Sequence, residues 1–379
     1  MFAHITNVPL ARHVELEFSK QNYLQAIEKL QRFSHIIHLG TGGSSLGPQS
    51  LYAMVDAPQK TFTFLDNIDP CGIYQRLKNV DLTKSGVLAV SKSGNTAETL
   101  VQLATIKKLY EASGLDINDY LVVITQTDGN ALHTFAKQNN VIVVPHHKQI
   151  GGRFAVFAEV GELPGILMGI DMQQFRSGAK SAIDSLKKEK DNYPPIQAAQ
   201  YLAESKLNPV VFPYSDKLKL FSAWFAQLWG ESLGKKNQQG TRFGSTPLQA
   251  LGATDQHSQL QLYIDGPKDK FFTFLEVTTH KKYEVSDLEI DHPSYNPLRR
   301  HSLDKLLKAE LDATFTTLKK HELPLRLITV PKVDAYHLGQ LMMNAVIETL
   351  HVAKIWDINP FDQPAVEEGK ILTLQFLNG

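Results

Sequence analysis

Residues 86–113 read GVLAVSKSGNTAETLVQLATIKKLYEAS, and this stretch decides the fold. It begins with an unbroken apolar run, turns through hydroxyl residues and a glycine, and continues as a helix-period stretch over 96–113. An apolar run of this kind suits a strand that is buried on both faces. The segment therefore predicts one strand-and-helix unit of a parallel sheet whose two faces are covered by helices.

The same alternation extends along the chain in both directions. Apolar runs predict further strands at 34–40, 61–66, 120–125 and 141–145, and a helical pattern occupies 130–139. A charge run followed by two prolines, KKEKDNYPP at 187–195, predicts a boundary. Beyond it we expect strands at 209–214, 259–266, 271–277 and 326–331, and helices at 216–236, 301–321 and 335–356. The chain thus reads as two α/β units, expected at 1–190 and 191–350, and a C-terminal segment at 351–379.

Composition narrows the class of protein. The 379 residues are 42% hydrophobic, and Lys+Arg and Asp+Glu both number 39, so the formal net charge is zero. A neutral chain has no general electrostatic attraction to nucleic acid or to an anionic membrane, and we expect neither as a partner. Cys71 is the one cysteine, which favours a reducing cytoplasm. No signal-like or bilayer-length apolar run occurs, so a cytoplasmic protein is expected.

A glycine-rich turn follows the first predicted strand. HLGTGGSSLGPQSL at 38–51 places Gly43 and Ser44 just before a predicted helix. Glycines let backbone N–H groups converge on an anion, and a helix N-terminus favours negative charge. Ser45 stands where a dinucleotide fingerprint requires glycine, and no Gly-Lys-Ser/Thr follows, so neither nucleotide motif fits. A tight turn that needs positive φ remains an equal explanation.

A second turn of this type lies within the opening segment. Its hydroxyl and amino groups, which suit a phosphate monoester, belong to Ser91, Lys92, Ser93 and Thr96. Asn95 and Glu98 could instead form a capping box, which would explain part of the loop. Two such turns after strands of one parallel sheet point to a ligand crevice at the strand carboxyl ends.

Two charged residues are hard to explain by structure alone. Arg153 follows a glycine pair at an expected helix start, where a cation opposes the helix dipole. The structural alternative is an ion pair with Glu159 or Glu162. Glu231 ends a Trp/Phe/Leu-rich helix, where an acid is electrostatically misplaced, and an apolar setting would suit a general base. A surface glutamate paired with Lys235 would be the commoner outcome.

Two further groups could move protons. His257 lies in GATDQHSQLQLYIDG at 252–266, where it could cap the strand expected at 259–266 or act as an acid and base. Lys370 lies in FDQPAVEEGKIL at 361–372, downstream of Gln363. Taken singly, both residues could be ordinary surface groups.

Taken together and in order, these stretches resemble the phosphoglucose isomerase family. The matching blocks are GTGGSSLGP, SKSGNTAET, GGRFAVFAEVGELP, QLWGESLGK, GATDQHSQLQLYIDGPKDK and FDQPAVEEGK. They run from residue 40 to 370. The resemblance implies two SIS-type three-layer αβα sandwich domains with parallel sheets, plus the C-terminal helical segment. It also implies a homodimer with shared active sites and a reaction that needs no cofactor and no metal.

The resemblance also implies roles for single residues. Glu231 would move a proton between C1 and C2, and Arg153 would steady the enediolate. His257, contributed by the other subunit, and Lys370 would open the sugar ring. The phosphate would lie on Gly43, Ser44, Ser91, Ser93 and Thr96, and Gln227 and Gln363 would line the substrate site. The chain departs from the usual pattern at Thr41, Ser45, 364–365 and Glu368, and it is short for the family.

The expected reaction is the reversible isomerisation of glucose 6-phosphate and fructose 6-phosphate through a cis-enediol(ate). Such chemistry needs a close base and a fixed positive group at the developing oxyanion, which fits the residue types above. Two alternatives stay open. One is a phosphosugar isomerase of different or dual specificity that accepts mannose 6-phosphate. The other is a non-catalytic SIS-type phosphosugar sensor, which would have no need of Glu231, His257 and Lys370 together.

Overall fold

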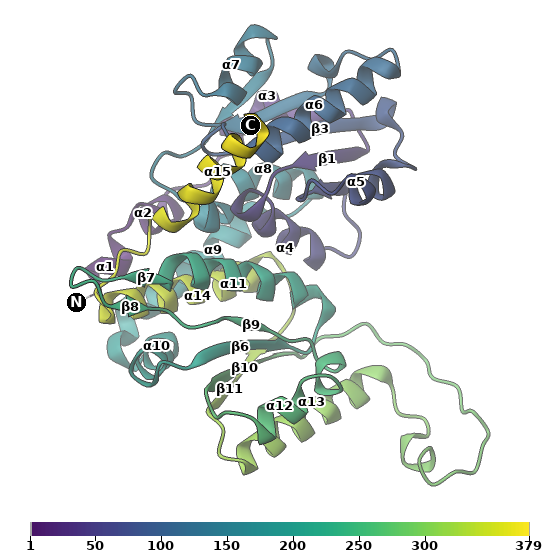
Figure 1. The fold of residues 1–379 in the computed structure, drawn as a ribbon. Coiled ribbons are helices and arrows are strands. Elements are labelled where there is room, and N and C mark those ends of the chain that lie inside the picture. The colour runs from purple at the N-terminus through teal and green to yellow at the C-terminus, as the bar shows by residue number, and fades with distance from the viewer. Residues whose placement is uncertain (1, 379) are drawn as a thin grey trace.

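The computed structural model describes residues 2–378 and contains two parallel sheets separated by a layer of helices (Figure 1). The first sheet has the order β2-β1-β3-β4-β5 and consists of β1 (His35–Leu39), β2 (Thr61–Leu65), β3 (Ser85–Val90), β4 (Leu121–Thr125) and β5 (Ile142–Pro145). The second has the order β11-β10-β6-β9 and consists of β6 (Asn208–Pro213), β9 (Leu248–Gln249), β10 (Lys270–Val277) and β11 (Leu325–Val330). The expected α/β class with two parallel sheets is confirmed.

The order of the strands creates a crevice in each sheet. From β1 the chain passes to β2 on one side and later to β3 on the other, so β1 and β3 lie together, with Leu39 opposite Ala89. The loops that follow two such strands diverge to opposite faces and leave room between them, which is where α/β folds bind ligands. The two hydroxyl-rich turns follow β1 and β3, so they meet at this point. The second sheet repeats the pattern, with β9 and β10 on opposite sides of β6.

The described chain contains fifteen α-helices, most of which pack around these sheets. Those on the first sheet and in the layer between the sheets are α1 (Ala3–Thr6), α2 (Pro9–Glu15), α3 (Leu24–Leu30), α4 (Leu46–Met54), α5 (Pro70–Leu77), α6 (Ala97–Ala112), α7 (Ala131–Gln138), α8 (Glu159–Met168) and α9 (Met172–Glu189). The remaining ones are α10 (Pro194–Ser205), α11 (Lys219–Leu233), α12 (Leu260–Asp265), α13 (Leu303–Lys320), α14 (Ala335–Ile355) and α15 (Glu367–Asn378). A short antiparallel hairpin joins β7 (Lys235–Lys236) to β8 (Arg242–Phe243).

The apolar strands are buried on both faces because each face packs against helices. Ile36 and Ile37 are both fully buried, yet Ile36 belongs to the core between the two sheets and Ile37 to the core on the outer face. Val211 and Val210 divide in the same way in the second sheet. One continuous core therefore links the two sheets through α9, α11 and α14 (Figure 1). The predicted boundary segment at 187–195 runs from the last residues of α9 to the first residues of α10, and the division at 190 stays a prediction.

The strand expected at 259–266 is wrong, because residues 260–265 form helix α12. Leu260, Leu262 and Ile264 occupy every second position, a spacing that a half-buried strand would also show. In the structure Tyr263 is buried, Leu260 and Ile264 pack beside it, and Leu262 is exposed. The buried positions are therefore spaced by three and four residues, which is the helical period. His257 consequently does not cap a strand.

Candidate active site

The glycine turn after β1 fits directly against the turn that carries Arg153. A Cβ atom on Gly43 would lie 2.2 Å from the carbonyl carbon of Gly152 and 2.6 Å from the backbone nitrogen of Arg153. Gly42 has φ of +53°, and a Cβ atom there would lie 3.0 Å from Nε2 of Gln227. The glycines are thus required both for the backbone conformation and for close approach. They bring the β1 turn, the Arg153 turn and α11 together.

The loop after β3 keeps its hydroxyl groups close to one another. Oγ of Ser91 lies 2.8 Å from Oγ1 of Thr96, and Oγ of Ser93 lies 3.5 Å from the same atom. The backbone nitrogen of Gly94, which has φ of +62°, donates to Oγ of Ser91 at 3.1 Å. Ser91 is buried at the base of the loop, whereas Ser93 is exposed. The three hydroxyls surround the N-terminus of α6, a helix of 16 residues.

The capping box considered for this loop is absent from the structure. The residue that caps α6 is Thr96, and no side chain accepts a hydrogen bond at that cap. Oδ1 of Asn95 instead accepts from the backbone nitrogen of Ala131 at 2.9 Å, which fastens the loop to the start of α7. The hydroxyls are therefore not consumed in capping. Backbone N–H groups at the start of such a helix are a ready anion site.

Lys92 connects this loop to the segment that leads to Arg153. Its Nζ donates to the backbone carbonyl of Ile150 at 3.0 Å. Burial lowers the pKa of the Lys92 ammonium, and the nearby carboxylate of Glu159 opposes that shift. The side chain of Lys92 is therefore a partly buried cation that joins the loop after β3 to the segment before Arg153.

Arg153 is the centre of the site. The side chain is 1% exposed, and its Nε donates to Oγ of Ser232 at 2.9 Å. Nη1 donates to Oε2 of Glu231 at 2.7 Å and to Oε1 of Gln363 at 3.0 Å. Nη2 donates to the backbone carbonyls of residues 360 and 362 at 2.6 and 3.0 Å. Burial lowers the pKa of the guanidinium, and the charge of Glu231 opposes this most strongly. Neither Glu159 nor Glu162 is its partner.

Glu231 is held at both carboxylate oxygens. Gln227 lies one helical turn earlier on α11, and its Nε2 donates to Oε1 of Glu231 at 2.7 Å, while Arg153 holds Oε2. The Glu231 side chain is 34% exposed, so the oriented carboxylate still faces an open space. Lys235, the surface partner considered for Glu231, binds Asp362 at 2.8 Å instead. A carboxylate that is oriented by two donors and accessible is suitable for abstracting a proton.

The structure does not bring every predicted residue to this point. Among residues 2–378 no hydrogen bond or ion pair joins His257 or Lys370 to the Arg153–Glu231 pair. His257 is exposed between the turn 254–256 and α12, near the second sheet. Lys370 pairs with Glu367 at 2.6 Å on α15, and its side chain is 65% exposed. A chain of hydrogen bonds thus joins Gln227, Glu231, Arg153 and Gln363, and the turns after β1 and β3 contact the segment that carries Arg153.

Ser232 belongs to the site but was not singled out from the sequence. It is fully buried, and it accepts the hydrogen bond from Nε of Arg153. The backbone carbonyls of Pro360 and Asp362 were also missed, because carbonyl groups leave no mark in a sequence. For Ser232 the available signal was its place on the buried face of α11, four residues after Leu228.

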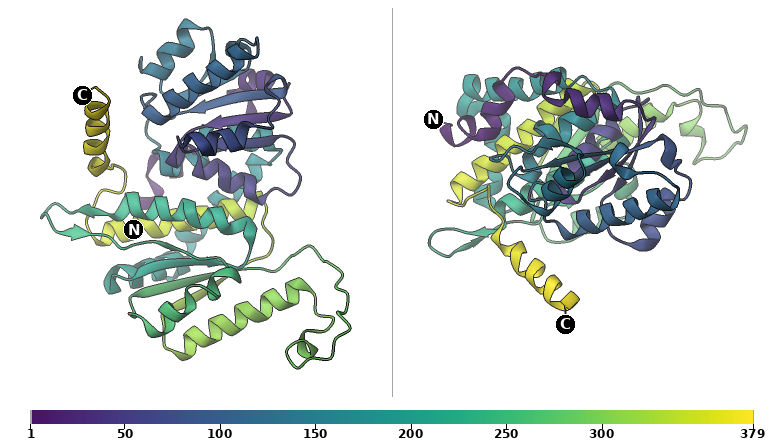
Figure 2. Two further views of the ribbon diagram at one scale, coloured as in Figure 1. Left: turned by 45° about the vertical axis from the view of Figure 1, so that its right-hand side comes forward. Right: turned by 90° about the horizontal axis from the view of Figure 1, so that it is seen from above.

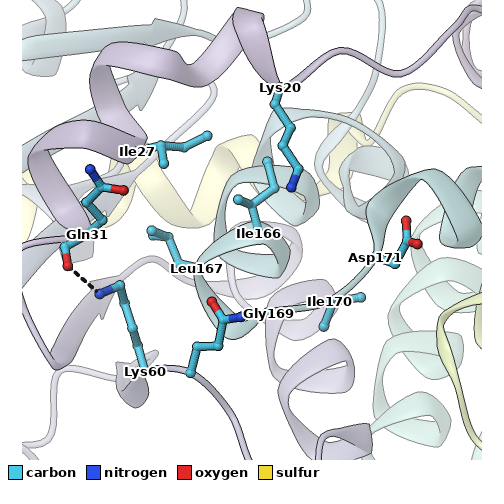
Figure 3. Close-up of a pocket in the computed structure, with 10 residues that line it drawn as sticks. Lys20, Ile27, Gln31, Lys60, Ile166, Leu167, Gly169, Ile170 and Asp171 are labelled. Atoms are coloured by element: carbon cyan, nitrogen blue, oxygen red, sulfur yellow. Dashed lines mark hydrogen bonds between the residues drawn. The ribbon is translucent and has the colours of Figure 1, made fainter.

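A separate pocket of about 400 Å³ opens between η1 (Lys20–Tyr23), α3 and α8 (Figure 3). Gln31 and Lys60 lie on its wall, joined by a hydrogen bond from Nζ of Lys60 to the backbone carbonyl of Gln31 at 2.9 Å. None of the residues that line this pocket belongs to the predicted site. We therefore assign the chemistry to the Arg153–Glu231 cluster.

Within residues 2–378, no group of three His, Cys, Asp or Glu side chains is arranged to hold a metal ion, and no helix is long and apolar enough to span a membrane.

Sequence comparison identifies close relatives over nearly the whole chain. A model of the phosphoglucose isomerase family matches residues 26–292. A probable glucose-6-phosphate isomerase from Methanococcus maripaludis is 35% identical over 370 residues, which cover 94% of this chain and 82% of the relative. A glucose-6-phosphate isomerase from Thermus thermophilus is 37% identical over 346 residues, which cover 90% of this chain and 83% of the relative.

Solved structures agree with the sequence comparison. A hypothetical protein from Thermus thermophilus superposes with a TM-score of 0.89 at 34% identity and covers all of this chain and 90% of that one. Glucosamine-6-phosphate deaminase from Thermotoga maritima superposes with a TM-score of 0.54 at 15% identity, over 96% of this chain and 97% of that one, and so shows likeness of fold alone. The expected SIS-like α/β architecture is confirmed by neighbours of this kind.

Proposed function

This chain belongs to the phosphoglucose isomerase family and interconverts glucose 6-phosphate and fructose 6-phosphate, and we propose that Glu231 is the base that moves the proton between C1 and C2. The observation that carries this role is the ion pair of 2.7 Å between Glu231 and the buried Arg153. A base must be close to the carbon acid and fixed in direction, and two donors fix this carboxylate. Its partial exposure leaves room for a sugar carbon.

Arg153 supplies the positive charge that the reaction needs. Removing a proton from carbon places negative charge on the neighbouring oxygen, and a preorganised cation in a water-poor site stabilises that charge strongly. The guanidinium is held at Nε by Ser232 and at Nη2 by backbone carbonyls, so its position is set before substrate arrives. Nη1 carries the bonds to the side chains of Glu231 and Gln363. We infer that the enediolate oxygen replaces the Gln363 contact at Nη1.

The phosphate group is assigned to the two turns at the crevice between β1 and β3. Ser91, Ser93 and Thr96 offer hydroxyls at the start of α6, and Gly43 and Ser44 offer backbone and side-chain donors at the start of α4. Lys92 contributes its positive charge to the phosphate site, while its Nζ stays bonded to the carbonyl of Ile150. The phosphate does not react, so its binding energy serves to position the reacting end of the sugar at Glu231.

The active assembly is proposed to be a homodimer that shares its sites. Support comes from His257, which is exposed and apart from Glu231 within one chain. In the proposed dimer, His257 of one protomer opens the sugar ring in the site of its partner, assisted by Lys370. The exposed helix α15, which carries Lys370, stands clear of the rest of the chain (Figure 2). It exposes Ile371, Leu374 and Phe376 by 57, 56 and 82%, an apolar surface that a second subunit would cover.

Fructose 6-phosphate turnover, coupled to the oxidation of glucose 6-phosphate, tests the base assignment. Glu231→Gln keeps the size of the side chain and one oxygen that accepts a hydrogen bond, but it removes the base. We expect wild-type protein to exchange the C2 hydrogen of the sugar with deuterium from heavy water and the variant to lose both exchange and turnover. Retention of exchange by the variant would exclude Glu231 as the base. Mannose 6-phosphate in the same assay tests the dual-specificity alternative.

A cytoplasmic location is also proposed, supported by the lone, exposed thiol of Cys71.

A further inference from the structure

A second carboxylate is buried where its charge acts on Lys92 of the loop after β3, and the isomerisation steps do not use it. Glu159 is the first residue of α8 and is 5% exposed. Its Oε1 accepts a hydrogen bond from the backbone nitrogen of His147 at 2.8 Å and lies 3.1 Å from Nδ1 of His146. His146 is 3% exposed, and its Nε2 has no partner within the described chain. Glu159 therefore organises the turn that leads from β5 toward Arg153.

Two sets of charged or titratable groups surround Glu159, a nearer set and a farther set made of Arg176, His13 and Arg153. The nearer set lies on the β3 loop, the turn after β5, η1 and α8, and comprises Lys92, His146, His147, Tyr23 and Glu162. Glu162 is already satisfied, because it pairs with Arg176 of α9 and accepts from the hydroxyl of Tyr23 at 2.5 Å. Arg176 in turn contacts His13 of α2, whose ring lies edge-on to His147 with centroids 5.4 Å apart. The positive charge of Arg153 also lowers the pKa of the Lys92 ammonium.

The ammonium of Lys92 would thus interact both with the carboxylate of Glu159 and with an anion bound on the hydroxyl loop. Its Nζ donates to the backbone carbonyl of Ile150, in the segment between His147 and Arg153, and its chain neighbours Ser91 and Ser93 carry the loop hydroxyls. Burial raises the pKa of the Glu159 carboxyl to about 7, although the His147 N–H and Lys92 oppose that shift. Burial lowers the pKa of His146 to about 4, so its imidazole is neutral near pH 7. The group poised to gain a proton here is Glu159.

We propose that Glu159 is a proton-linked positioning residue, which takes up one proton from solvent when a phosphate dianion binds on the Ser91–Thr96 loop. This inference rests on the phosphate site of the proposed function. Before binding, Lys92 faces one negative charge at Glu159. A dianion on the loop adds two negative charges near the same ammonium, and like charges disfavour ionisation of the carboxyl. Protonation of Glu159 leaves Lys92 to the phosphate and preserves the hydrogen bond at Oε1 from His147.

The inference predicts a pH dependence of binding with a definite sign. Phosphosugar affinity weakens as pH rises above about 7, because the complex holds a proton that the free enzyme has lost. A phosphate monoester is already a dianion in this range, so its own ionisation contributes little. If binding raises the proton affinity of Glu159 about tenfold, uptake at pH 7.5 is about half a proton per site. A residue that only holds the turn in place would produce no such slope.

Titration calorimetry on the full-length enzyme measures this uptake directly. The probe is a pre-equilibrated mixture of glucose 6-phosphate and fructose 6-phosphate, which binds without net reaction, at pH 7.5 in two buffers of different ionisation enthalpy. The difference between the two heats gives the protons taken up. We expect about half a proton for the wild type and none for Glu159→Gln, which retains an oxygen to accept from His147. Glu348→Gln is the matched control, since Glu348 is also buried at 3% exposure and paired with Arg326 on the second sheet; it should keep the uptake.

Two outcomes overturn the inference. One is wild-type binding without proton uptake, and the other is uptake that persists unchanged in Glu159→Gln. Turnover measured on the same wild-type sample separates this result from the proposed function, because an active enzyme without uptake refutes only the role of Glu159. If Glu159→Gln does not fold, the test is the dissociation constant of the wild-type enzyme for the same sugar phosphate mixture, measured between pH 7 and 9. A dissociation constant that does not change with pH contradicts the inference, and one that rises toward high pH supports it.

Discussion

Arg153 and Glu231 are 78 residues apart in the chain and form an ion pair of 2.7 Å, with the arginine buried at 1% exposure and the glutamate open at 34%. The asymmetry matters, because a buried cation holds its position while an accessible carboxylate can reach a substrate. Breaking a buried pair by removing one partner leaves an uncompensated charge and is costly. This relationship joins the β5–α8 connection to α11 and sets the direction in which Glu231 can accept a proton.

Replacing Glu231 by glutamine should abolish most of the turnover and leave the fold intact. General acid–base groups are worth ~10²–10⁴ in rate, so we expect kcat to fall within that range. Stability should also fall, because the amide oxygen can still accept from Arg153 but the buried guanidinium loses the carboxylate that balances its charge. Steady-state kinetics and thermal unfolding of the same samples measure both effects. A variant with near wild-type kcat would contradict the role of Glu231.

Mixed dimers test whether the site is shared. Glu231→Gln and His257→Ala are each expected to be inactive alone. After subunit exchange, about half of the dimers carry one variant chain of each kind. In these dimers one site combines both substitutions, while the other has an intact Glu231 and an intact His257. We therefore expect about a quarter of wild-type specific activity to return. If both groups came from one chain, no complete site would form and the mixture would stay inactive.

Gly43→Ala should destabilise the protein, because its Cβ atom would collide with backbone at Gly152 and Arg153 rather than with a mobile side chain. Overpacking of this kind costs about 1–3 kcal/mol and would shift Arg153 as well. Urea unfolding and kcat should both report the loss. Gly369→Ala is the control, since no atom lies within 4 Å of its added Cβ; it should leave the free energy of unfolding unchanged or slightly higher.

Charged substitutions on α15 should weaken association. Leu374 and Phe376 are 56 and 82% exposed on a helix of 12 residues that contains no buried residue. A helix of that length is marginal without packing, so we expect a partner to stabilise it. Leu374→Glu with Phe376→Glu should shift the dimer toward monomer in light scattering and lower activity in parallel. A monomeric wild type, or an unaffected double variant, would contradict the proposed assembly surface.

The buried histidine behind the first turn should make stability depend on pH. His38 lies 2.9 Å by its Nε2 from the carbonyl of Ser44, and burial lowers its pKa to about 4 from 6.5. The unfolded state binds a proton more readily, so stability is present above pH 6.5 and is lost as pH falls toward 4. Between pH 7 and 5 the wild type should lose about 2 kcal/mol more than His38→Gln. Urea unfolding at the two pH values checks this; equal losses would contradict it.

Local patterns were sufficient for much of the fold. The strand β3 and the helix α6 follow from residues 86–113 because buried parallel strands need continuous apolar runs. The prediction failed for α12, where the alternation of Leu260, Leu262 and Ile264 is compatible with both strand and helix. The capping box at Asn95, the alternative explanation of the loop after β3, is absent because that side chain binds Ala131 instead. In both places distant neighbours decided between two local possibilities.

The sequence by itself determined the parallel α/β class, the turns after β1 and β3, and the residue types of the site, because strand burial, glycine conformation and charge are properties of short segments. Only the tertiary structure decided that Arg153 meets Glu231 rather than Glu159, and that one core joins the two sheets. It also decided that His257 and Lys370 lie apart from that pair within a single chain. The partner of a charged side chain is set by the packing of segments that are far apart in the sequence, and no local sequence pattern encodes which of these segments come together.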